Sequence, residues 1–72
     1  MLSVQINSKR KVYVELTPDT APNKGGFFCQ LYWDTEKEFH IDDFVIRKEQ
    51  IAGGGIKTAM LYANKKVKDM FC

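Results

Sequence analysis

The stretch FFCQLYW, residues Phe27–Trp33, decides the fold of this chain, because both of its alternating faces carry apolar side chains. One face holds Phe27, Cys29, Leu31 and Trp33, and the other holds Phe28, Gln30 and Tyr32. A short run that is apolar on both faces is typical of a strand covered by neighbours on each side. The sequence therefore predicts a central strand over residues 27–33.

Two further strands are predicted before this stretch. Residues 2–6 alternate apolar and polar side chains, and residues 11–16 do the same with a high content of β-branched residues. The polar run Asn7–Arg10 between them has the composition of a turn, so the two strands are expected to form an antiparallel hairpin. Residues 17–26 contain two Pro and two Gly and are expected to form a loop, whose role stays open.

The region after the central strand is ambiguous. Asp34–Lys37 has the composition of a turn, and Glu38–Ile41 is expected to be a fourth strand with Phe39 and Ile41 facing inward. Residues 42–51 fit either a strand or a helix, because Asp42-Asp43 interrupts the alternation. The β-branched content favours a strand through Ile46.

A helix is predicted at the end of the chain. Ala52–Gly55 is a break, and from there apolar residues recur at helical spacing, at Ile56, Ala59, Met60, Ala63, Val67, Met70 and Phe71. The fold class is therefore α+β, an antiparallel sheet of three to four strands with one C-terminal helix packed on one face. A chain of 72 residues forms one small domain, residues 1–72.

The face assignment predicts a core and an uncovered surface. The expected core is Phe27, Leu31, Trp33, Val12, Val14, Ala59, Met60, Ala63, Val67 and Met70. One helix covers only one face, so Tyr13, Phe28 and Tyr32 are expected on the other face, as candidates for a protein interface. The alternatives are cross-strand pairing that only stabilises the sheet, and stacking of nucleic-acid bases.

Charge is distributed unevenly although the net charge is only +2. Two basic ends flank an acidic segment at residues 34–43, which would repel phosphate if it faced the same way. The candidates for nucleic-acid contact are Lys9, Arg10 and Lys11 at the hairpin tip and Lys57, Lys65, Lys66 and Lys68 on the helix.

Motifs for catalysis are weak. Gly53–Thr58 lacks the spacing of a phosphate-binding loop, since Ile56 separates the last Gly from Lys57. Glu38, His40 and Asp42 would project to one side of a strand, but charged residues there also suit a solvated edge, and no metal site is predicted. Cys29 lies mid-strand among apolar residues, where a thiol is inert. We expect neither an enzyme nor a cofactor.

Cys29 and Cys72 are interpreted as free thiols, which favours a reducing cytoplasm. No apolar run is long enough to span a membrane, and no signal peptide is recognised, so no membrane association is expected. The sequence favours a small non-enzymatic protein-interaction or regulatory module, whose partner is another protein or a second copy of the chain. The alternative is a nucleic-acid-binding module that uses the basic hairpin tip and the helix lysines.

Overall fold

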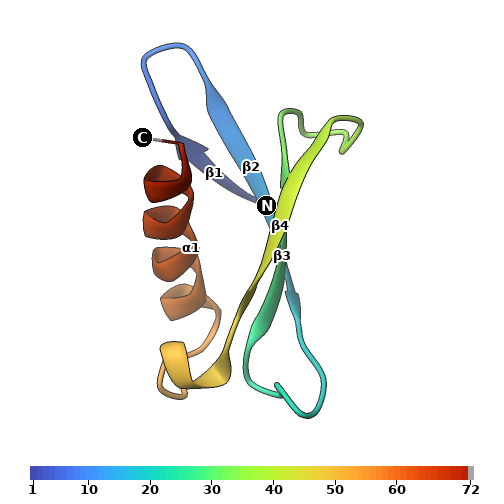
Figure 1. Ribbon diagram of the computed structural model, residues 1–72, viewed down its shortest axis with the longest axis vertical. Helices are drawn as coiled ribbons and strands as arrows, with labels where there is room; N and C mark the ends of the chain where they lie inside the picture. The colour runs from blue at the N-terminus through green and yellow to red at the C-terminus, as the bar shows by residue number, and fades with distance from the viewer. Residues whose placement is uncertain (72) are drawn as a thin grey trace.

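The computed structural model describes residues 1–71, and Cys72 lies outside them. Its elements in chain order are β1 (Leu2–Gln5), β2 (Lys11–Pro18), β3 (Phe27–Tyr32), β4 (His40–Ile46), the short 3₁₀ helix η1 (Lys48–Gln50) and α1 (Ile56–Met70). Figure 1 shows the two layers, with α1 along one side of the sheet. The α+β class, with a sheet followed by one C-terminal helix, is confirmed.

The four strands form one antiparallel sheet in the order β1-β2-β3-β4. β3 pairs with β2 on one side and with β4 on the other, so its interior position is confirmed. The hairpin of β1 and β2 is confirmed too, with Val4 opposite Val12. β2 runs further than predicted, because Thr17 and Pro18 still pair with Phe28 and Phe27.

The ambiguous region divides between a strand and a helical turn. β4 runs through Ile46 as predicted, and η1 follows it. Asp42 and Asp43 lie inside the strand and do not interrupt it. The pairing shifts between Leu31, which faces Asp42, and Tyr32, which faces His40, so Ile41 is the extra residue of a β-bulge.

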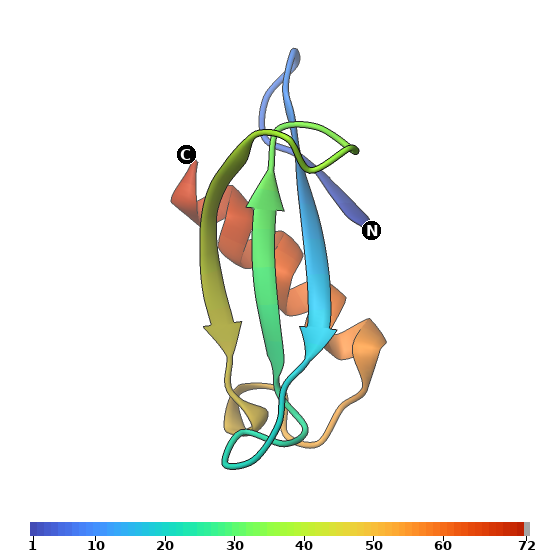
Figure 2. The ribbon, with the colours of Figure 1, turned by 90° about the vertical axis from the view of Figure 1, so that its right-hand side faces the viewer.

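The helix packs on the sheet through small side chains. Ala59, Ala63 and Val67 are fully buried and lie on one stripe of α1. Small residues there let the helix backbone approach the strands closely. Ala52 and Gly53 both have positive φ, so the chain breaks before α1 as the sequence predicts. Figure 2 shows α1 crossing behind the strands obliquely.

The core lies between α1 and the facing side of the sheet. Its buried members are Val4, Val12, Val14, Phe27, Cys29, Leu31, Ile46, Ile51, Ala59, Ala63 and Val67. Met70 was expected in the core and is 39% exposed, which is a correction. It is the last residue of α1, three positions beyond Val67, which is the last buried residue of the helix. Trp33 and Met60 are only partly buried.

Within residues 1–71, no helix combines the length and the apolar composition that crossing a membrane requires.

Candidate functional site

The face of the sheet opposite α1 is uncovered, and Figure 2 views the molecule from that side. Because directly paired residues share a face, the register arranges this surface in rows across the strands. The rows are Ser3–Tyr13–Tyr32–His40, Glu15–Gln30–Asp43 and Thr17–Phe28–Val45. A polar row therefore separates two rows that carry aromatic side chains.

The structure brings two of the three predicted interface residues together. Tyr13 lies directly opposite Tyr32, whereas Phe28 lies beyond the polar row, opposite Val45. Tyr32 is only 8% exposed, and its ring centroid lies 5.4 Å from that of His40. Tyr13 and Phe28 are half-buried. The tyrosine row therefore offers little free aromatic surface, and Val45, at 48% exposed, is the most open apolar position of these rows.

A groove of about 850 Å³ lies at one end of the sheet, between the β1–β2 turn and the β3–β4 loop. Figure 1 shows both connections at the same end of the molecule. The lining residues are Gln5, Ser8, Lys9, Arg10, Lys11, Tyr13, Trp33 and Phe39. This set, which we call the basic aromatic groove, contains three cations, three aromatic rings and, among residues 1–71, no carboxylate.

The basic wall of the groove is built by the β1–β2 turn. The side-chain oxygen of Asn7 accepts hydrogen bonds from the backbone N–H groups of Lys9 (2.8 Å) and Arg10 (3.0 Å). The N–H of Ile6 donates to the carbonyl of Arg10 at 3.1 Å and closes the turn. Asn commonly fixes turns in this way, so one side chain places successive cations at the tip.

The aromatic wall is built by the β3–β4 loop. The N–H of Trp33 donates to the carbonyl of Phe39 at 3.0 Å, and the Asp34 carboxylate accepts from the N–H groups of Glu38 and Phe39. These bonds hold Phe39 with 62% of its surface exposed. Phe39 was expected to face inward in a strand that begins at Glu38, and that prediction is wrong because β4 begins only at His40.

Arg10 and Trp33 join the two walls. The guanidinium carbon of Arg10 lies 4.6 Å from the centroid of the Trp33 ring, which is cation–π geometry. This ring also contacts Phe71, whose ring centroid lies 5.7 Å away in an edge-to-face arrangement. Trp33 thus links the groove to the end of α1.

The acidic segment, residues 34–43, lies close to the groove, but some of its charged side chains already have partners. The Asp34 carboxylate accepts backbone hydrogen bonds within its own loop, and Lys37 forms an ion pair with Glu15 of β2. Glu36 and Glu38 are exposed on the same loop as Phe39. These two carboxylates oppose an anion that approaches from the loop side, so the hairpin side is the favourable approach.

The helix lysines do not join this groove. Lys66 extends toward β4, with its Nζ 5.8 Å from the centroid of the Phe44 ring. Lys57 lies at the other side of α1, along a shallow groove with Leu2 and Ser3. Lys65 and Lys68 are exposed. The predicted nucleic-acid residues therefore divide between the hairpin tip and the separate surface of α1.

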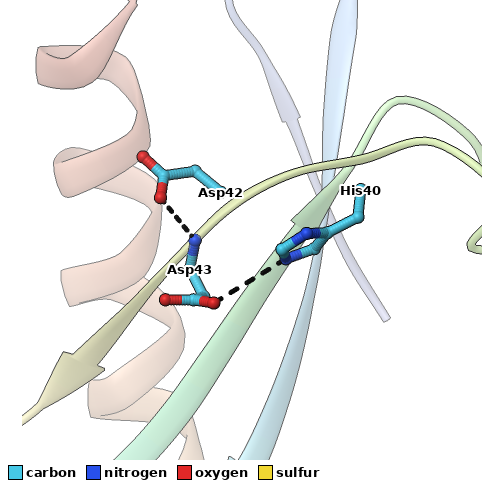
Figure 3. Close-up of polar contacts among 3 residues, drawn as sticks. All are labelled: His40, Asp42 and Asp43. Carbon is cyan, nitrogen blue, oxygen red and sulfur yellow. Dashed lines mark hydrogen bonds and ion pairs between the residues drawn. The ribbon is translucent and has the colours of Figure 1, made fainter.

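The three residues considered for a metal do not share a face. Because of the β-bulge, His40 lies opposite Tyr32 on the uncovered face, and Asp42 lies opposite Leu31 on the helix face. Glu38 precedes β4. The expectation that they project to one side is therefore wrong. Figure 3 shows the contacts that form instead: Asp42 accepts the Asp43 N–H at 2.8 Å, and Asp43 lies 3.8 Å from His40.

No group of three His, Cys, Asp or Glu side chains within residues 1–71 is arranged to hold a metal ion. Cys29 is fully buried, and burial raises the pKa of its thiol to about 11, which disfavours the nucleophilic thiolate.

Sequence reasoning did not find Trp33 and Phe39 as walls of one groove with Lys9, Arg10 and Lys11. The sequence carried no signal for this arrangement, since it depends on how two turns at the same end of the sheet approach one another. A scan of known protein families, of curated proteins and of solved structures finds no match to the chain.

Proposed function

We propose that this chain is a small non-enzymatic interaction module that holds an anionic partner in the basic aromatic groove. The observation that carries the proposal is the convergence of Lys9, Arg10 and Lys11 with the rings of Tyr13, Trp33 and Phe39 around one concave surface. Concave sites with a few placed polar groups and aromatic walls are typical of ligand binding. The partner is an acidic segment of another protein or a nucleic acid.

A binding role without catalysis is supported by the chemistry of the nucleophile candidate. The Cys29 thiol is buried in the core and held protonated, so it serves packing rather than attack. A free thiol in the core also supports our placement of the module in a reducing compartment such as the cytoplasm.

Charge reversal at the groove tests the proposal. Anisotropy of a labelled polyglutamate peptide and of a labelled single-stranded oligonucleotide is measured at low and at high salt. We expect micromolar binding of at least one anion at low salt, with affinity that falls steeply as salt rises. The double variant Lys9→Glu, Lys11→Glu should abolish this binding.

The matched control is Lys65→Glu with Lys68→Glu, which changes the net charge equally but lies on α1, away from the groove lining. We expect it to weaken binding only slightly, through the long-range field. Equal loss in both double variants, or no binding of either anion at low salt, would contradict the proposal.

Self-association through the uncovered face is a second candidate. It is favoured by the row of Thr17, Phe28 and Val45, because Val45 keeps 48% of its surface exposed on a face that no other layer covers. Sedimentation across a wide concentration range tests it, with Val45→Glu as the disrupting variant. A monomer at every concentration in the unaltered chain would reject this candidate.

A further inference from the structure

We propose that the basic aromatic groove binds single-stranded nucleic acid, stacking bases on Phe39 while Lys9, Arg10 and Lys11 contact phosphates. This inference rests on the proposed function, since it names the class of anion that the groove takes. It depends on three features of the groove: an exposed ring on a hydrogen-bonded backbone, a guanidinium that lies over Trp33, and cations without carboxylates in the lining.

Phe39 is the stacking platform. It exposes 62% of its surface, yet its backbone is held at both ends, by the Trp33 N–H on its carbonyl and by Asp34 on its N–H. With the backbone held in this way, only the side-chain torsions of Phe39 remain to be ordered on binding. Every base has a π face, so such a ring accepts any unpaired base.

Arg10 is held for phosphate contact. Its guanidinium lies over the face of Trp33, and that ring is held in turn by the edge-to-face contact with Phe71. Trp33 is therefore a positioning residue rather than a stacking one, because Arg10 already covers one of its faces. A guanidinium oriented beforehand suits bidentate contact with a phosphate.

The exposed ring of Phe39 would favour a single strand over the other anions, because only a single strand offers unpaired bases for stacking. Bases of a duplex stack on one another, so a duplex could use only the cations of the groove. An acidic peptide likewise needs cations but has no flat group to stack on Phe39. RNA and DNA share the phosphates and base faces that the groove would contact, so both are included as probes.

The first measurement compares four labelled probes by anisotropy at low salt: oligothymidylate and oligouridylate of about ten nucleotides, a duplex of equal length, and a polyglutamate peptide. We expect at least one single strand to bind about tenfold more tightly than the duplex or the peptide. Trp33 is the single Trp of the chain, so quenching of its emission should accompany binding in the groove.

Substitution of the platform is the second measurement. Phe39→Ala should weaken single-strand binding about tenfold and leave the peptide unaffected, while Phe39→Trp should restore it. The control Leu61→Ala removes another exposed apolar side chain, 72% exposed on α1, and should change nothing. Thermal unfolding verifies that the Phe39 variants fold.

The outcomes separate the two proposals. Equal binding of single strand, duplex and peptide, unchanged by Phe39→Ala, would reject base stacking while the anion-binding function stands. Preference for the peptide would reject nucleic acid as the ligand. Failure of every probe at low salt would reject both proposals.

Discussion

The side-chain oxygen of Asn23 accepts a hydrogen bond at 3.0 Å from the backbone N–H of Lys48, which lies 25 residues further along the chain. The amide nitrogen of Asn23 donates to the carbonyl of Ile46 at 3.2 Å and to Asp19 at 2.9 Å. One partly buried side chain therefore holds the β2–β3 loop against the end of β4.

Removal of this side chain should destabilise the fold. Asn23→Ala is expected to lower the free energy of unfolding by about 1–3 kcal/mol, because partly buried backbone groups lose their partner. Urea denaturation followed by circular dichroism measures the change. Asn64→Ala on α1 is the matched control and should have little effect, since Ala favours helices. Equal stability of the two variants would show that the hydrogen bonds of Asn23 do not stabilise the fold.

The same contact should be visible in the titration of Asp19. The hydrogen bond from Asn23, with a second from the Thr20 N–H, lowers the pKa of this carboxyl below 3.8. Its contribution to stability is therefore present above pH 3.8 and is lost as the pH falls through the lowered value. In an NMR titration, Asn23→Ala should raise the pKa of Asp19. An unchanged value would mean that Thr20 alone causes the shift.

The ring of Trp33 should stabilise the domain, although it is only partly buried. Trp33→Ala is expected to cost about 2–3 kcal/mol, less than the about 3–5 kcal/mol of a fully buried ring, because contacts with Phe71 and Arg10 are lost at the margin of the core. Thermal melting measures it, with the exposed ring variant Phe39→Ala as control. If Trp33→Ala lowers the melting temperature no more than Phe39→Ala does, the packing of the Trp33 ring does not stabilise the domain.

Asp42 hinders the pairing of another strand with the free edge of β4. The register directs the Asp43 N–H away from β3, and the Asp42 carboxylate accepts it at 2.8 Å (Figure 3). Charge and the neighbouring bulge both hinder pairing with another strand. Asp42→Val should therefore promote self-association, measured by light scattering, whereas Asp69→Ala on α1 should not. A monomeric Asp42→Val variant would show that Asp42 is not required to prevent self-association through this edge.

The thiol of Cys29 should be protected in the folded chain. In a Cys72→Ser background, alkylation at mildly alkaline pH is expected to be negligible until denaturant is added, because burial raises the pKa to about 11. The free energy of unfolding should fall as pH rises from 9.0 toward 11, since the unfolded chain releases this proton first. Rapid labelling of the folded chain would contradict the burial of Cys29.

The sequence by itself determined the strands and the helix and, for β2, β3 and most of α1, which side chains face the core. Alternation in residues 11–16 and 27–31 and the helical stripe of Ala59, Ala63 and Val67 are local patterns, and each predicts which side chains turn toward the core. The helix also begins where predicted, because Ala52–Gly55 separates two periodicities.

Only the tertiary structure decided the bulge at Ile41 and the exposure of Phe39 and Met70. It also decided the groove, which two turns form together across a gap of more than twenty residues between Arg10 and Trp33. Such features depend on register and on the approach of distant segments. Local periodicity holds no information about either, because a shift of one residue in pairing changes every face while leaving the sequence pattern intact.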